Sequence, residues 1–156
     1  METPAPGRTV AFGHIGVHVS DLQRSIDYYR DVIGLEQVER RIRDDAYLST
    51  VTGYAEVRLD TCLLVDRSSG IMLELLEMLS SPGEAMEPGT ANPGTMHMCF
   101  IVDDVDAVHA RAVAAGHSAV NDPVTPTAGG WQGGRSVYLL DPDRVRVEIV
   151  QPGPDA

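Results

Sequence analysis

Residues 14–21 read His14-Ile15-Gly16-Val17-His18-Val19-Ser20-Asp21, and this stretch decides the fold. Its aliphatic residues alternate with small or polar ones, which is the period of a β-strand. Ser20, with Gln23 three residues later, predicts the capped start of a helix, and Gly34 predicts its end. The stretch is therefore a strand that passes directly into a helix.

The same order of residues returns in the second half of the chain. Residues 97–104 read His97-Met98-Cys99-Phe100-Ile101-Val102-Asp103-Asp104, and the helical pattern that follows ends at Gly116. His97 follows His14 by 83 residues, and Asp104 follows Asp21 by the same 83. Similarity at a fixed offset indicates a duplicated supersecondary unit.

Around these two units the chain divides into five segments. They are a flexible leader (residues 1–9), a first βαβββ module (10–79), a linker rich in Pro and Gly (80–94), a second βαβββ module (95–151) and a tail (152–156). Within the modules we expect a loop with one helical turn at 45–53 and a short strand at 117–120. The order predicts an α+β fold in which two tandem modules form a curved, barrel-like mixed sheet.

Bulk properties exclude several classes of protein. A net charge of −11 over 156 residues, without a basic stripe, excludes a nucleic-acid partner. No apolar run approaches the roughly 18 residues that a membrane span needs, and the first residues have no apolar signal core. Two cysteines make no disulfide framework. We expect a cytoplasmic protein that acts on a small molecule, away from membranes.

A glutamate strand completes each copy of the repeat. Glu74 lies in the run Met72-Leu73-Glu74-Leu75-Leu76, and Glu148 lies in Val145-Arg146-Val147-Glu148-Ile149-Val150. A carboxylate among aliphatic residues is costly to bury unless it is paired or binds a metal. One such glutamate is usually a solvent-facing strand residue, but two in a repeat that also duplicates a histidine favour ligands.

Two imidazoles and two carboxylates form a donor set for a single divalent metal ion. His14, Glu74, His97 and Glu148 suit Zn, Ni, Co, Mn or Fe, and an octahedral ion would keep two positions open. A substrate with two adjacent oxygens could chelate there, and the metal would stabilise a developing enolate. A glutamate that leaves the metal, Glu148 or Glu74, could then move the proton on the carbon next to the carbonyl.

The chain resembles the vicinal oxygen chelate superfamily, which includes glyoxalase I, methylmalonyl-CoA epimerase, extradiol dioxygenases and bleomycin resistance proteins. The resemblance extends from Phe12 to Gln151. Its motifs are residues 14–16, 20–22, 28–31 and 33–35 in the first half, and His97, 102–105, Gly116, 138–143 and Glu148 in the second. One departure is Arg144, which follows Pro142-Asp143 where the family usually has Gly. It suggests a different turn, or a cation near the mouth of the site.

The resemblance implies a metal-dependent lyase or isomerase of the glyoxalase or epimerase type, built as a homodimer. Its metal positions fall on His14, Glu74, His97 and Glu148. Two other functional hypotheses stay open. An extradiol dioxygenase would use two histidines and one carboxylate, which leaves one glutamate over. A non-catalytic drug-binding resistance protein often lacks the ligand set that this chain retains.

Other residues carry weaker hypotheses. Trp131, in the glycine-rich stretch 129–134, would cover a substrate or pack at the rim, and Arg135 would meet a substrate anion or make a surface ion pair. The remaining residues receive structural interpretations: His18 a hydrogen-bonded pocket or core role, Cys99 a buried apolar role, and solvent-facing positions for Glu77, His109 and His117.

Overall fold

The computed structural model describes residues 7, 9, 11–87 and 91–154. The predicted leader lies outside the described residues except for Gly7 and Thr9, as do positions 88–90 of the linker and 155–156 of the tail. None of the helices described is long and apolar enough to cross a membrane.

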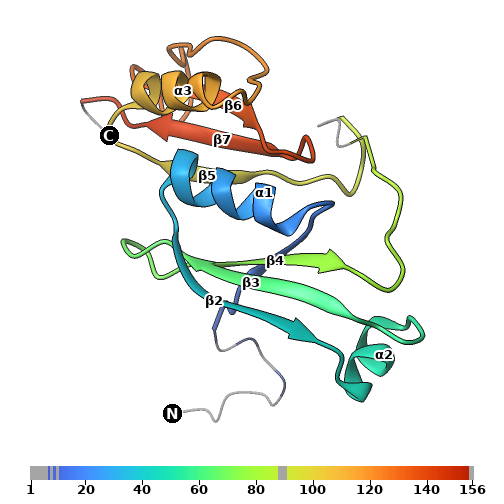
Figure 1. The fold of residues 1–156 in the computed structure, drawn as a ribbon. Coiled ribbons are helices and arrows are strands. Elements are labelled where there is room, and N and C mark those ends of the chain that lie inside the picture. The colour runs from blue at the N-terminus through green and yellow to red at the C-terminus, as the bar shows by residue number, and fades with distance from the viewer. Residues whose placement is uncertain (1–6, 8, 10, 88–90, 155–156) are drawn as a thin grey trace, which may run out of the picture.

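The first module forms a four-stranded mixed sheet with one helical segment on its face (Figure 1). Its elements are β1 (Ile15–His18), α1 (Leu22–Asp27), the π-helical continuation η1 (Tyr28–Ile33), β2 (Glu36–Arg43), α2 (Ala46–Thr52), β3 (Leu59–Val65) and β4 (Met72–Met78). The strand order is β1-β4-β3-β2, with β1 and β4 parallel and the other pairs antiparallel.

The second module forms a separate three-stranded sheet in the order β5-β7-β6. Its elements are β5 (Met98–Ile101), α3 (Val105–Ala114), β6 (Arg135–Leu140) and β7 (Arg146–Gln151). As in the first module, the strand before the helix pairs in parallel with the last strand. The α+β class with mixed sheets is therefore confirmed, as two sheets rather than one closed barrel.

Three local predictions are corrected. Asp21, not Ser20, caps α1, because its carboxylate accepts a hydrogen bond from the Arg24 backbone N–H. Where a loop with one helical turn was expected, residues 46–52 form the seven-residue helix α2, because Leu48 is buried against the sheet. The strand expected at 117–120 reduces to an isolated bridge between Ala119 and Leu139.

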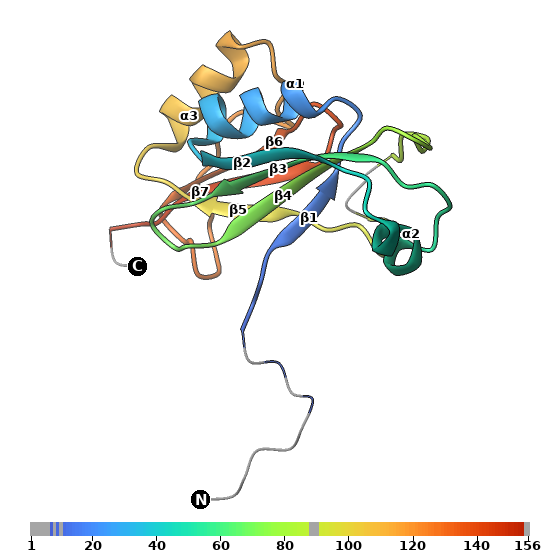
Figure 2. The ribbon, with the colours of Figure 1, turned by 60° about the horizontal axis from the view of Figure 1, so that its bottom comes forward.

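The two modules share one hydrophobic core, and both helices lie side by side on the same side of the strands (Figure 2). Apolar residues of α1, η1 and α3 pack against the alternate, inward-facing residues of both sheets. The helices end where Gly34 and Gly116 adopt positive φ angles of 97° and 85°, as the sequence predicts. The sheet faces that point away from the helices are left to carry polar side chains.

Polar contacts also connect the modules at the turn between β6 and β7. The buried Asp141 carboxylate accepts a hydrogen bond from the Tyr29 hydroxyl at 2.9 Å, and from the backbone N–H groups of Asp143 and Val145. Asp143 in turn accepts from Ser20 and Arg24 at the start of α1. These bonds fix the second sheet relative to the first helix.

Candidate metal centre

The first half of the predicted centre is already assembled. His14 directly precedes β1, and Glu74 lies on the neighbouring strand β4, where Gly16 is its register partner. His14 Nε2 lies 3.2 Å from Glu74 Oε2, and 51% of the histidine side chain and 23% of the glutamate side chain are exposed. Both side chains are therefore accessible on the open face of the first sheet, with one nitrogen and one oxygen donor in contact with each other.

The second half repeats this geometry. His97 directly precedes β5, and Glu148 lies on β7 opposite Cys99. His97 Nε2 lies 3.3 Å from Glu148 Oε2, with exposed fractions of 45% and 18%. Because the parallel pairing of the first and last strands recurs in both modules, the 83-residue repeat brings the same two side chains together twice.

Each pair fits a metal ion in both chemistry and spacing. Imidazole nitrogen and carboxylate oxygen are the donors that divalent transition metals take in proteins. Two donors bound at about 2.1 Å and at right angles to one another lie about 3 Å apart. The observed separations of 3.2 and 3.3 Å are close to that value.

One chain does not bring the two pairs together. Within the part of the chain that the structure describes, no group of three or more His, Cys, Asp or Glu side chains is placed to hold a metal ion. His14 with Glu74 and His97 with Glu148 thus remain two half-sites on two different sheets. In the described part of the chain, the four predicted ligands therefore do not form one centre.

The surroundings of the two half-sites differ in polarity. Around Glu148 the neighbouring strands supply Tyr138 and Cys99. Partial desolvation by the neighbouring side chains, and then the negative charge of Glu148, raise the pKa of the Cys99 thiol to about 11 although the residue is exposed, and the same causes raise the pKa of the half-buried Tyr138 hydroxyl. Around Glu74 the equivalent register positions hold Gly16 and Leu63, which have no polar side chain.

The weaker candidates have other partners or positions in the structure. Arg135 donates to Asp106 at 3.0 and 2.5 Å and so connects β6 to α3. Trp131 is half-buried in a turn where the Gly133 N–H donates to the Pro126 carbonyl. His18 is exposed, which contradicts the expected pocket or core position. Arg144 adopts a φ of 68°, the conformation for which glycine is favoured.

Four further interpretations need correction. Glu77 does not face solvent, since its carboxylate accepts a hydrogen bond from the Leu22 N–H at 2.9 Å. Cys99 is exposed rather than buried, because the open face of the sheet is uncovered. His109 and His117 are half-buried, and the His117 ring lies edge-on to Tyr28 with centroids 4.8 Å apart. Desolvation and the charge of Arg24 lower the pKa of His117.

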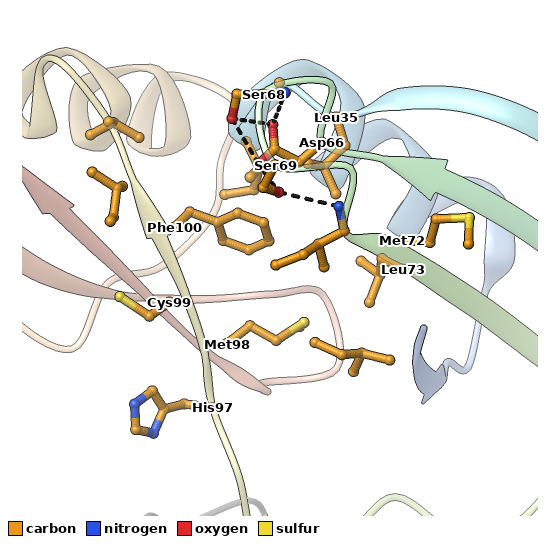
Figure 3. A pocket seen from close by; sticks show the side chains of 16 residues that line it. Leu35, Asp66, Ser68, Ser69, Met72, Leu73, His97, Met98, Cys99 and Phe100 are labelled. Carbon is orange, nitrogen blue, oxygen red and sulfur yellow. Dashed lines mark hydrogen bonds between the residues drawn. The ribbon is translucent and has the colours of Figure 1, made fainter. Parts of the chain in front are cut away.

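A cavity of about 420 Å³ lies on the other side of β5 (Figure 3). The side chains of Met98 and Phe100 point to this side, and those of His97 and Cys99 to the opposite side. The cavity is also lined by Leu73 of β4 and by the turn before it. His97 and Cys99 line it as well, so the cavity lies between the modules and reaches the second half-site.

Two mixed sheets with a parallel first-to-last strand pair and matched His–Glu pairs define a vicinal oxygen chelate protein. The chain belongs to the Glyoxalase/Bleomycin resistance protein/Dioxygenase superfamily, whose sequence profile matches residues 11–149. This confirms the family that the sequence motifs indicated.

Individual relatives carry different activities. The chain is 27% identical over 149 residues to a 2-epi-5-epi-valiolone epimerase from an Actinomyces species, covering 93% of this chain and 80% of the relative. It is 27% identical over 161 residues to a lactoylglutathione lyase from Pseudomonas putida, covering 97% and 90%. A glyoxalase family protein from Bacillus cereus has the same fold, with a TM-score of 0.86, 18% identity and coverage of 97% and 99%.

Proposed function

We propose that this protein is a divalent-metal-dependent lyase or isomerase of the glyoxalase or epimerase type, active as a homodimer. The observation that carries the proposal is the pair of matched half-sites, each with a nitrogen and an oxygen donor just over 3 Å apart. His14 and Glu74 of one subunit, with His97 and Glu148 of the partner subunit, would hold one metal ion. Symmetry would give two such centres in each dimer.

The bound metal would supply Lewis-acid stabilisation of negative charge on an oxygen of the substrate. The chain itself would supply proton transfer and binding. Released from the metal, the Glu148 carboxylate, which keeps 18% of its side chain exposed, would take a proton from the carbon next to a carbonyl and return it. Glu74 occupies the equivalent place in the other half-site, so the two carboxylates could transfer protons at opposite faces of a substrate carbon.

The polar surroundings favour Glu148 over Glu74 as the proton carrier. The Tyr138 hydroxyl and the Cys99 thiol lie beside the Glu148 carboxylate and can orient it, whereas Leu63 and Gly16 beside Glu74 cannot. The substrate would be a 2-oxo compound, a hemithioacetal or an acyl thioester, because these acidify the carbon next to a carbonyl. The names of the epimerase and lyase relatives agree with that class.

Metal analysis of the purified protein tests the proposal. We expect one ion per chain in the wild type, and Glu148→Gln should lower metal affinity by at least about tenfold. Activity should be screened with thioesters and 2-oxoaldehyde hemithioacetals. Glu84→Gln is the matched control, because Glu84 is exposed and outside the half-sites. If Glu148→Gln retained full metal content and full activity, the proposal would be refuted.

A further inference from the structure

All twelve Lys and Arg side chains of this chain are arginines, and eight of the eleven that the structure describes have a carboxylate partner. The sequence contains no lysine. Among the described residues, the arginines with a carboxylate oxygen within 4.0 Å are Arg24, Arg30, Arg40, Arg41, Arg43, Arg67, Arg135 and Arg144. Arg111 donates to the Val32 carbonyl. This leaves Arg58, which is exposed, and Arg146, which is half-buried.

Arg146 lies on the same open face as the second half-site. It precedes Glu148 by two residues on β7, so both side chains point to the same side of the sheet. Its guanidinium lies 6.0 Å from the ring centroid of Tyr138, and that ring lies 5.4 Å from the His97 ring. The guanidinium therefore adjoins the half-site through an aromatic side chain and has no carboxylate partner among the described residues.

A half-buried cation without a counter-ion loses hydration and gains no ion pair in return. The first half-site has no such group. Met72 holds the position two residues before Glu74 on β4. When a first half and a second half face each other, the position two residues before the glutamate is apolar on the first sheet (Met72) and positively charged on the second (Arg146). An anionic group is the ligand that this arrangement would stabilise.

Deepening the proposed function, on which this inference rests, we propose that Arg146 binds a carboxylate or phosphate group of the substrate and makes this protein specific for anionic substrates. Residues two apart on a strand lie about 6.7 Å from each other. The anionic group is therefore placed a few carbon atoms from the carbon that faces Glu148. In a chain of net charge −11, this local cation also offsets the repulsion that an anionic substrate meets.

Two matched ligands test this specificity. 2-Oxoglutarate and 2-oxopentanoate share the 2-oxo acid that could chelate a metal, and differ in a distal carboxylate in place of a methyl group. Their binding to the protein as purified, with its metal, is measured by calorimetry. We expect 2-oxoglutarate to bind about tenfold to a hundredfold more tightly. In 2-oxo-4-phosphonobutanoate a phosphonate replaces the distal carboxylate of 2-oxoglutarate, so comparing the two affinities shows whether a carboxylate or a phosphate-like group is preferred.

Arg146→Gln should abolish the preference by weakening the charged ligands and leaving 2-oxopentanoate unchanged, while Arg146→Lys should retain part of it. Arg58→Gln, which removes the same charge elsewhere, should keep the wild-type preference. Light scattering measures the oligomeric state of the wild type and of each variant.

The inference is overturned if Arg146→Gln keeps the preference, if neither 2-oxo acid binds, or if the variant changes only the oligomeric state. If wild type binds both 2-oxo acids equally and Glu148→Gln weakens metal binding, the inference fails and the proposed function stands. If Glu148→Gln leaves metal binding and activity intact, and Arg146→Gln still abolishes the preference for the charged ligands, the proposed function fails and the anion-binding role of Arg146 stands.

Discussion

Two inactive variants should restore one another if the metal centre is shared between subunits. The first variant, His14→Ala with Glu74→Gln, destroys the first half-site of its chain. The second, His97→Ala with Glu148→Gln, destroys the second half-site. Because the structure places these pairs on separate sheets, each variant chain keeps one intact half. Neither variant alone should assemble a four-ligand centre.

The size of the recovery follows from two-fold symmetry. A mixed dimer has one centre made of two intact halves and one made of two destroyed halves. Random pairing of equal amounts gives mixed dimers in about half of the population, so about one quarter of the wild-type centres should return. Mixed dimers isolated through two different affinity tags should carry about half of the wild-type metal per chain.

Metal content and turnover of co-expressed, doubly purified dimers provide the assay. The matched control is co-expression of His14→Ala with Glu74→Gln as separate single variants, since both lie in the first half and every centre would then contain one defect. Recovery in the control, or none in the complementary pair despite confirmed mixed dimers, would refute the shared centre. Full metal content in either double variant alone would refute the ligand set itself.

Three further predictions concern the fold that supports the centre. Asp141→Ala should lower the free energy of unfolding by about 3 kcal/mol, since it leaves the Tyr29 hydroxyl and two backbone N–H groups without their acceptor, whereas Asp141→Asn should cost about 1 kcal/mol; urea denaturation distinguishes them. The pKa of His117 is lowered in the folded protein from 6.5, so the native state binds fewer protons than the unfolded chain and stability should fall as pH drops below about 6.5. His117→Phe keeps a ring against Tyr28 and should flatten this part of the stability–pH curve; an unchanged curve would exclude His117 as its source. Arg144→Gly should be more stable than Arg144→Ala by about 1 kcal/mol, because both lose the exposed ion pair to Glu87 and only glycine relieves the positive φ; equal melting temperatures would contradict this.

Much of the fold follows from local patterns in the sequence. The alternation before Ser20, the helical spacing after it and the stops at Gly34 and Gly116 depend on neighbouring residues, and the structure confirms them. The cap was predicted at Ser20 instead of Asp21, and only one turn of the helix at 46–52 was predicted. Adjacent Ser and Asp are almost equivalent caps, and a short helix is stable only when its apolar face is packed.

Some residues of the candidate site could be predicted from the sequence, and others are placed there only by the tertiary structure. The repeat predicts the residue types of both half-sites, and the strand period alone would have placed Arg146 on the face of Glu148. The position of Tyr138 beside His97 and Glu148 could not be predicted from the sequence, because it results from pairing between β6 and β7. Glu77 is also different: its parity correctly places it on the face opposite Glu74, but that face meets the N-terminus of α1 instead of water.

The sequence by itself determined the duplicated unit, the family and the two kinds of donor side chain, because periodicity and spacing along the chain encode them. Tertiary structure decided how the units face one another. The shared core and the bonds of Asp141 and Asp143 fix both helices on one side of the strands, so each sheet turns its His–Glu pair outward. Such long-range packing has no local signature, because it depends on contacts between residues more than a hundred positions apart.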